Sequence, residues 1–305
     1  MTPPALLIPG GRGQLGSELV GLRGKRRDGL VHAPGSGELD ITDEEALNDA
    51  VDSFTDAASD AGMRPVVVNL AAYTAVDAAE SDRATAERVN TRGPADLARI
   101  CRNRGVPLLH VSTDYVFSGD ATEPYEPEDE VGPRSVYGRT KLDGERAVLE
   151  NHPRAWVVRT AWVYGAAGAN FVSAMAGLAA ERETVSVAAD QFGSPTWAAD
   201  LAGGLLELAE SVARRDEPAR RVLHCTNSGS TSRYEFARAV FGELGVDPDR
   251  VRAASTADVP RPAPRPAFSV LSDRRWTESG LTGLRPWRAA LSAAFATHGT
   301  SWAAR

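Results

Sequence analysis

A tyrosine and a lysine stand four positions apart in "SVYGRTKLDGE", residues 135–145. In a helix, side chains at i and i+4 are neighbours, so Tyr137 and Lys141 would lie on one face. A phenol beside an ammonium group can act as a general acid, because the positive charge lowers the pKa of the tyrosine from its ordinary value of about 10. Such pairs also occur by chance on solvated helix faces, so a catalytic interpretation needs support from elsewhere in the chain.

A glycine-rich stretch, "IPGGRGQLGSEL", follows a short apolar run and opens a helical pattern. This strand–turn–helix junction can bind a dinucleotide pyrophosphate: Gly10 permits the turn, Gly13 the approach of backbone to phosphate, and Gly16 the packing of helix on sheet. The helix N-terminus adds free N–H groups. The alternative is a glycine turn with no ligand. We expect the dinucleotide to contact Gly10, Arg12, Gly13, Gln14, Leu15 and Gly16.

The elements that position these residues follow from hydrophobic patterning in the first half of the chain. Apolar, β-branched runs alternate with helical patterns, which is typical of a parallel sheet covered on both faces. Right-handed crossovers then favour an α/β, doubly wound (Rossmann-type) fold. Strands are predicted over 5–10, 30–33, 65–72, 106–113 and 155–165, and helices over 14–23, 42–54, 81–103 and the segment with Tyr137.

The pattern changes after residue 165 and predicts a smaller α/β substrate-binding cap. We expect residues 1–165 to form an NAD(P)-binding domain, completed by a returning segment near 193–225, and residues 166–305 to form mainly the cap. The segment "VPRPAPRPAF", 259–268, has four prolines in ten residues. Its apolar continuation favours an ordered, extended lid over a disordered linker. Helices are predicted over 170–182, 196–214 and 232–244, and a strand over 221–227.

Composition limits the functional classes. The formal net charge of −7 argues against a nucleic-acid partner, which would favour a basic surface. Two cysteines, and five histidines without ligand spacing, predict neither a disulfide framework nor a metal site. The sequence shows no leader pattern and no apolar run of membrane-spanning length, so we expect a cytoplasmic protein that does not bind membranes.

The glycine spacing, GxxGxxG, resembles that of the short-chain dehydrogenase/reductase superfamily. In those enzymes a Tyr-x-x-x-Lys pair does the chemistry, and a serine or threonine earlier in the chain completes the set. Thr113 stands 24 positions before Tyr137, at the end of the apolar run "LLHVST". Asn90, in "ERVNTRG", matches an asparagine of the extended members. Together these matches are far more specific than any one of them.

Longer segments are similar to the dTDP-4-dehydrorhamnose reductase family over nearly the whole chain. They include "NLAAYTAVDAAE" (69–80), "STDYVFSGD" (112–120), "RTAWVYG" (159–165) and "DQFGSPTWAADLA" (190–202). The resemblance implies reduction of the C4 ketone of dTDP-4-dehydro-6-deoxy-L-mannose to dTDP-L-rhamnose by NAD(P)H. One departure is Phe268, which stands where the family usually has asparagine, and it puts the lid contacts in question.

The resemblance also assigns the catalytic residues. Tyr137 would protonate the developing alkoxide, and Lys141 would lower the pKa of that tyrosine and hold the nicotinamide ribose. Thr113 would donate a hydrogen bond to the same oxygen. The remaining residues expected to contact the cofactor are Asp40 and Ile41 at the adenine, with Ala71, Ala72 and Thr74 along the ribose and pyrophosphate. The residues expected to contact the substrate are Val76, Thr113, Trp162, Asn170 and Phe171. Alternatives remain for Asp40, as an acid at a helix start, and for Trp162, as core packing.

Two features of the sequence bear on the choice between NADH and NADPH. An NAD site normally carries an acid about 20 residues beyond the glycine loop, but the residue there is Ser36, and Glu38 lies beyond a Pro34-Gly35 turn. Arg12 could instead face a 2′-phosphate, so we expect NADPH to be preferred and NADH also to be used. Some family members form dimers bridged by Mg²⁺. Glu18 matches one acid of that contact, but "PTWAADLA" has alanine at the other, so a bridged dimer is not favoured and monomer and homodimer both stay open.

Four other functions remain to be weighed. Another nucleotide-sugar reductase would show the same motifs, and an epimerase shares the loop and the Tyr/Lys pair. Dehydratases resemble one another in a Thr-Asp-Glu triplet, whereas this chain has Tyr115 after Asp114, which argues against dehydration. The NADP-binding regulatory subunit of methionine adenosyltransferase is also similar but is not catalytic. The intact Thr113, Tyr137 and Lys141 set favours an enzyme.

Overall fold

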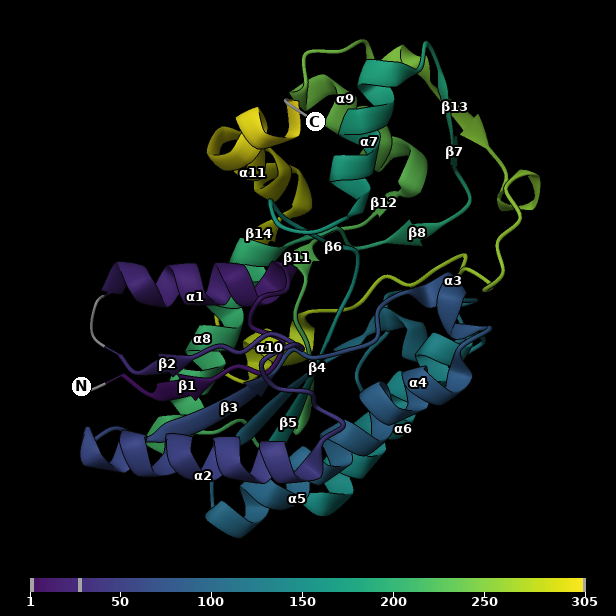
Figure 1. The fold of residues 1–305 in the computed structure, drawn as a ribbon. Coiled ribbons are helices and arrows are strands. Elements are labelled where there is room, and N and C mark those ends of the chain that lie inside the picture. Colours follow the sequence, from purple (N-terminus) through teal and green to yellow (C-terminus); the bar gives the residue numbers. More distant parts are fainter. Residues whose placement is uncertain (1–2, 27–28, 304–305) are drawn as a thin grey trace.

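Six parallel strands form one sheet in the computed structural model, which describes residues 3–26 and 29–303 (Figure 1). The chain order reverses between β1 and β3, and ligands of doubly wound sheets bind at such a switch point, beyond the carboxyl ends of the strands. The predicted α/β doubly wound fold is therefore confirmed. Across the sheet the strands are β10 (Val222–His224), β5 (Ala155–Thr160), β4 (Leu108–Thr113), β3 (Pro65–Asn69), β1 (Ala5–Leu7) and β2 (Val31–His32).

Helices cover both faces of this sheet (Figure 1). Side chains of a strand alternate between faces, and those of β1 and its neighbours are buried on each side. Leu6 and Ile8 join the apolar cluster under α1 (Gln14–Arg26) and α8 (Ala198–Arg214). Ala5 and Leu7 join the cluster on the opposite face. The helices there are α2 (Glu44–Asp60), α5 (Gly93–Arg104) and α6 (Val136–Asn151).

The single helix predicted over 81–103 is wrong. The chain instead forms α3 (Val76–Ala79), α4 (Arg83–Glu87), a π-helical turn (Arg88–Arg92) and then α5. Pro94, at the start of α5, lacks the N–H that would continue an α-helix, and π-turns mark such interruptions. Asn90 lies within the turn, where its buried side chain bonds the backbone N–H and C=O of Tyr73 and the hydroxyl of Thr140. The irregular turn therefore ties α6 to the loop after β3.

The strand predicted over 155–165 is also interrupted. Trp162 adopts a left-handed φ of 47°, a conformation uncommon outside glycine. The following strand, β6 (Val163–Tyr164), pairs with β9 (Thr196–Trp197) instead of the main sheet. This break directs the chain out of the sheet and into the cap.

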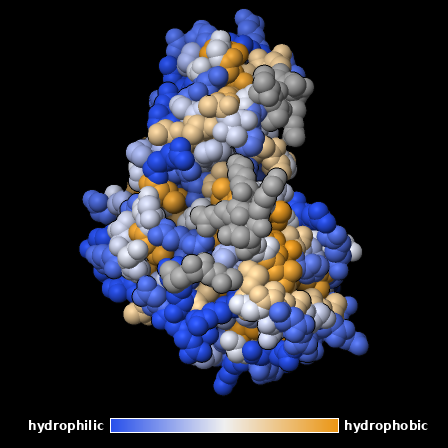
Figure 2. Space-filling model, turned by 90° about the vertical axis from the view of Figure 1, so that its left-hand side faces the viewer, coloured by the Kyte–Doolittle hydropathy of each residue, from blue (hydrophilic) through white to orange (hydrophobic). Residues whose placement is uncertain are grey.

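The cap lies above the sheet in Figure 1 and has its own apolar core. Figure 2 shows this narrower part over the broader lower part, with hydrophilic residues and smaller apolar areas interspersed on the visible face. Tyr164, Phe236 and Leu291 are fully buried in that core. The main cap elements are α7 (Phe171–Glu181), β7 (Val185–Ala188), α9 (Arg233–Glu243), β13 (Val251–Ala254) and α11 (Trp287–Ala303), with β8 (Phe192–Gly193), β12 (Thr231–Ser232), β11 (Asn227–Ser228) and β14 (Leu284–Pro286) at its base. The short helix α10 (Arg274–Glu278) packs on the main sheet instead, beside β10, and its Trp276 joins the apolar cluster under α8.

The proline-rich lid is an extended, hydrogen-bonded segment, as its sequence predicts. The N–H of Phe268 donates to the Gly119 carbonyl, and the N–H of Ser269 donates to the Phe192 carbonyl. Arg265 binds Asp77 through two bonds of 2.7 and 2.9 Å. The lid therefore bridges the cap and the loops of the first half. None of the helices in the described ranges is long and apolar enough to span a membrane.

Candidate active site

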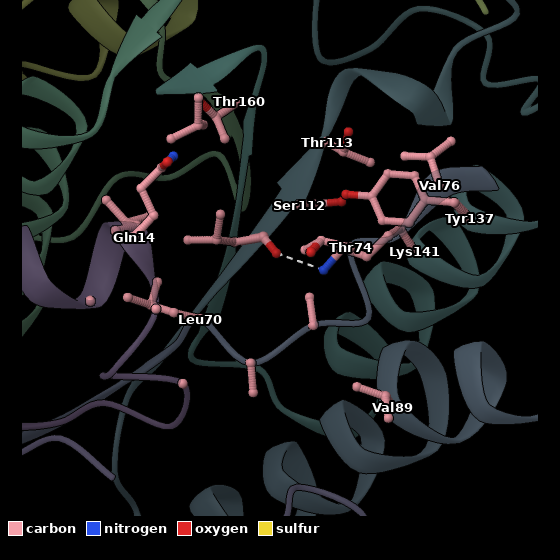
Figure 3. A pocket seen from close by; sticks show the side chains of 18 of the residues that line it. Gln14, Leu70, Thr74, Val76, Val89, Ser112, Thr113, Tyr137, Lys141 and Thr160 are labelled. Carbon is pink, nitrogen blue, oxygen red and sulfur yellow. Dashed lines mark hydrogen bonds between the residues drawn. The ribbon is translucent and has the colours of Figure 1, made fainter. Parts of the chain in front are cut away.

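A cavity of about 780 Å³ opens at the switch point of the sheet (Figure 3). Its walls are the start of α1, the loops after β3, β4 and β5, and the first turns of α6. A volume of this size suits a cofactor or drug-sized ligand. Sixteen of the predicted site residues line it: Gly10, Arg12, Gly13, Gln14, Leu15, Gly16, Asp40, Ile41, Ala71, Ala72, Thr74, Val76, Thr113, Tyr137, Lys141 and Trp162.

The glycine loop fits a dinucleotide for steric reasons. Gly10 has a φ of +80°, and a Cβ there would lie 2.6 Å from the Ala71 nitrogen. A Cβ on Gly16 would lie 2.5 Å from the Gly11 Cα, so the helix packs directly on the turn. Gly13 has only the Gly10 carbonyl oxygen nearby, at 3.2 Å, which leaves space on its other side. Backbone can thus approach a ligand at Gly13, and the N-terminus of α1 offers N–H groups to a pyrophosphate.

At the end of the cavity where the adenosine is expected, two acidic groups already have hydrogen-bond partners. Asp40 accepts hydrogen bonds from the backbone N–H and the hydroxyl of Thr42, both at 2.9 Å. It therefore has the local role of an acid near a helix start, and it also lines the cavity. Arg12 pairs with Glu38 at 3.0 Å, and both side chains are largely exposed. The bonds from Arg12 and from the Gly35 N–H lower the pKa of Glu38 to about 2. Arg12 therefore lines the cavity where the 2′-phosphate is expected, but its guanidinium is paired with Glu38.

Tyr137 and Thr113 meet because α6 packs closely on the turn after β4. Ser135 caps the helix by accepting from the Gly138 N–H at 3.0 Å. A Cβ on Gly138 would lie 2.3 Å from the Tyr115 carbonyl oxygen, so glycine is required between Tyr137 and Lys141. Burial raises the pKa of Tyr137, with the Thr113 hydrogen bond opposing that shift, so the net change is opposite to the lowering expected from Lys141. The phenol is therefore held in its protonated form beside Thr113.

Lys141 lies one helical turn further and is buried on the same wall (Figure 3). Its Nζ donates to the Val111 carbonyl at 2.8 Å and lies 3.4 Å from His110 Nε2. Burial lowers the pKa of Lys141 to about 8, because the charged form loses hydration. Asn90 is not among the residues lining this cavity, and its bonds to Tyr73 and Thr140 give it a framework role.

Four of the five predicted substrate residues border a second cavity, of about 820 Å³, between α7 and the lid, whereas Thr113 lines only the first. Trp162 and Val76 line both cavities, while Asn170 and Phe171 line only the second. Asn170 caps α7 and also donates to Gln14 Oε1 at 2.9 Å, so its amide links the cap to α1. Phe171 stacks on Phe236, with ring centroids 5.3 Å apart.

Trp162 has features of both a binding residue and a packing residue. A Cβ on Gly193 would lie 2.3 Å from its ring, so one edge packs tightly. The guanidinium of Arg233 lies 3.5 Å from the ring centroid, a cation–π arrangement. The remaining surface of the indole lines the two cavities.

Sequence reasoning missed the charged residues of the second cavity. Arg233, Arg261 and Arg265 line it together with a single carboxylate, Asp77. Asp77 lies 2.7 Å from Arg265 and 3.6 Å from Arg261, whereas burial lowers the pKa of Arg233 to about 10. The arginines between the lid prolines could have been predicted to line the cavity, because a docked lid must place some of them inward. Arg233 had no such signal, since its position depends on how α9 packs.

Two expectations concern groups away from both cavities. Phe268 lines neither cavity and packs beside Phe117 and Leu271, so the departure from the family pattern lies in the lid's support. Glu18 lies 3.5 Å from His298. Within residues 3–26 and 29–303, no cluster of three or more His, Cys, Asp or Glu side chains could hold a metal ion.

Comparison with known proteins agrees with this geometry. The model of the RmlD substrate binding domain family matches residues 4–299. A dTDP-4-dehydrorhamnose reductase of Mycobacterium tuberculosis is 50% identical over 302 residues, 97% of this chain and 94% of that protein. A probable dTDP-4,6-dihydroxy-2-methyloxan-3-one 4-ketoreductase of Streptomyces antibioticus is 46% identical over 95% of this chain and 94% of its own.

One of the similar solved structures contains a bound cofactor. The dTDP-4-dehydrorhamnose reductase of Bacillus anthracis in complex with NADP has a TM-score of 0.87 and 32% identity, covering 97% of this chain and 99% of that one. The chain thus belongs to the RmlD family, the dTDP-4-dehydrorhamnose reductases of the extended short-chain dehydrogenase/reductase superfamily.

Proposed function

We propose that this protein reduces the C4 ketone of dTDP-4-dehydro-6-deoxy-L-mannose to give dTDP-L-rhamnose. The observation that carries the proposal is the convergence of Thr113, Tyr137 and Lys141 on one wall of a cavity whose opposite wall is the glycine loop. A proton donor therefore faces the place where a dinucleotide would lie. NAD(P)H, when bound, supplies the hydride.

The side chains of this wall bind the oxygen of the sugar C4 carbonyl and supply its proton. Tyr137, protonated at neutral pH, donates its proton to the alkoxide as the ketone is reduced. Thr113 holds the same oxygen by a hydrogen bond, which stabilises developing negative charge. Lys141 lies one turn away and favours the phenolate that remains. Thr113 and Lys141 are buried and Tyr137 is half-buried, so screening of these interactions by water is weak.

The second cavity suits the nucleotide part of the substrate. Arg233 and Arg261 would neutralise the diphosphate, since Asp77 offsets only one of the three arginine charges. Trp162 would contact the sugar where the two cavities meet. An apolar surface from Met175, Leu178, Val185 and Val187 would take the thymine base. In this proposal the segment 1–165, with the return near 193–225, binds the dinucleotide, and residues 166–305 mainly bind the sugar nucleotide.

For the cofactor, the proposal is a preference for NADPH with NADH also accepted. Arg12 borders the adenosine end beside Gly35 and Ser36, where a 2′-phosphate would lie. Its pair with Glu38 is exposed, and exposed pairs stabilise little. A 2′-phosphate can therefore compete for Arg12. A cytoplasmic location, as monomer or homodimer, completes the proposal.

A second candidate is reduction of a different dTDP-4-keto sugar. It is favoured by the 46% identity to the Streptomyces antibioticus ketoreductase. The test compares kcat/KM for dTDP-4-dehydro-6-deoxy-L-mannose and for dTDP-4-keto-6-deoxy-D-glucose, with product configuration read by NMR. The proposal predicts at least a tenfold preference for the first and a rhamno product. Preferred turnover of the second would establish the alternative, and turnover of neither would contradict the proposed function.

A further inference from the structure

Two buried polar residues lie beneath Lys141 and have no role in the proposal above. His110, on β4, is 0% exposed, and Asn69, the last residue of β3, is 1% exposed. Asn69 Nδ2 lies 3.1 Å from His110 Nδ1, and His110 Nε2 lies 3.4 Å from Lys141 Nζ. The three side chains thus form a buried row that ends at the catalytic lysine.

The orientation of the Asn69 amide fixes the tautomer of His110. The backbone N–H of Ala71 donates to Asn69 Oδ1 at 3.1 Å, so the amide oxygen faces Ala71 and the NH₂ group faces the ring. An amide NH₂ only donates, and His110 Nδ1 must therefore accept. Burial, and next the charge of Lys141, lower the pKa of His110, so the ring is neutral. A neutral imidazole has one proton, which then lies on Nε2, directed at Lys141.

This arrangement opposes the ammonium form of Lys141. An ammonium has three N–H groups and no lone pair, so its Nζ and His110 Nε2 would be two donors facing each other. An amine can accept from Nε2–H and still donate to the Val111 carbonyl. The other tautomer of His110 does not remove the conflict, because its Nδ1–H would face the Asn69 NH₂. Flipping that amide as well would set NH₂ against the Ala71 N–H. Deprotonation of Lys141 therefore completes one buried hydrogen bond.

We propose that Asn69 and His110 act as positioning residues that lock this tautomer and ease proton release from Lys141. During turnover Tyr137 gives its proton to the sugar oxygen and becomes a phenolate. Lys141 gives up one proton to restore the phenol, and the resulting amine accepts from His110 Nε2–H. Solvent then returns a proton to the amine. This catalytic use rests on the proposed reductase function, whereas the tautomer itself does not.

Other groups near Lys141 act in both directions. Glu145, on the same helix, favours the ammonium, but it is bound by Arg159 through bonds of 2.7 and 3.0 Å. The charge that reaches Lys141 from Glu145 is therefore partly neutralised. The titratable groups around Lys141 are Tyr137 and Glu145 on α6, His110 on β4, Asp114 and Tyr115 in the turn after β4, and Arg159 on β5.

Long-range ¹H–¹⁵N NMR of the histidine rings tests the lock without any turnover. The His110 signals are identified by their loss in His110→Gln, and the exposed His32 serves as reference for an unconstrained ring. The lock predicts His110 protonated on Nε2 above pH 9, with its nitrogen shifts changing once as Lys141 titrates. A ring protonated on Nδ1 at that pH would overturn it.

Kinetics then test the consequence for Lys141. Proton supply should fail as pH rises, so kcat/KM falls on a basic limb. Asn69→Leu and Asn69→Asp each free the ring to accept from the ammonium, and both should move that limb up by about one pH unit, the equivalent of one buried hydrogen bond. Ser112→Ala, on the same strand as His110, should leave the limb where it is. A shift in Asn69→Asp alone would mean added charge and not a lock. If the wild type reduces neither sugar, the proposed function fails while the NMR result still decides the tautomer.

Discussion

The two cavities are built from the chain in different ways. The cavity at the switch point is formed largely by backbone: the glycine loop, the N-terminus of α1 and the strand ends carry its shape. The cavity under the lid is formed by side chains such as Asp77, Trp162, Arg233 and Arg261, which are brought together from distant segments. A site made of backbone tolerates few substitutions at glycine, whereas a site made of side chains can change its ligand one residue at a time. The reductase fold can thus keep its cofactor while the sugar varies.

The largest expected effect lies where the two cavities meet. Tyr137→Phe keeps the ring but removes the proton donor, so kcat/KM for the keto sugar should fall about 10²- to 10⁴-fold. Binding of NADPH and of dTDP, measured by calorimetry, should stay within about twofold, since neither needs the proton. An unchanged rate would remove Tyr137 from the chemistry.

A second variant should break the backbone-built cavity alone. Gly10→Ala places a Cβ 2.6 Å from the Ala71 nitrogen at a φ of +80°, so the loop must shift. NADPH binding should weaken at least tenfold, and dTDP binding should be retained. Gly177→Ala is the matched control, because a Cβ there meets nothing within 4 Å. Equal loss of both ligands in Gly10→Ala would indicate general unfolding instead of a local defect.

The reverse experiment targets the cavity made of side chains. Arg233→Met keeps an unbranched side chain at this position but removes the guanidinium that lies over Trp162. Hydrogen bonds to charged groups are worth about 1.5–3 kcal/mol. Affinity for dTDP should therefore fall about 10- to 100-fold while NADPH binding is unchanged. Arg238→Met, on the same helix and paired with Asp249, is the control. If dTDP bound equally well to both variants, Arg233 would be a packing residue only.

Much of the first cavity could be predicted because its determinants are local in sequence. The spacing of Gly10, Gly13 and Gly16 fixes a turn, and four residues of helix place Tyr137 over Lys141. The second cavity depends on contacts between distant segments. The left-handed Trp162 is imposed where the chain leaves the sheet.

The wrong helix boundary has a similar origin. Pro94 marks the interruption in the sequence, but periodicity cannot show that the π-turn places the buried side chain of Asn90 against Tyr73 and Thr140. His110 gave no signal either. In the sequence it is one residue of a buried strand, and only the structure shows that it lies between Asn69 and Lys141.

The smallest expected effect concerns cofactor choice. Arg12→Ala should lower the ratio of kcat/KM for NADPH over NADH by about three- to tenfold, since an exposed charge contributes little. Glu38→Gln should raise the same ratio, because it frees Arg12 and removes a negative charge near the 2′-phosphate. A ratio that did not change in either variant would place the 2′-phosphate elsewhere.

The most direct test of the account follows the hydride itself. NADPH carrying deuterium at the transferable C4 position is incubated with the enzyme and dTDP-4-dehydro-6-deoxy-L-mannose, and the product is analysed by NMR and mass spectrometry. The account predicts dTDP-L-rhamnose with one deuterium at sugar C4, and loss of that product in Tyr137→Phe. Recovery of unlabelled substrate, or of a sugar with no deuterium at C4, would contradict the assignment of this site as a C4 ketoreductase.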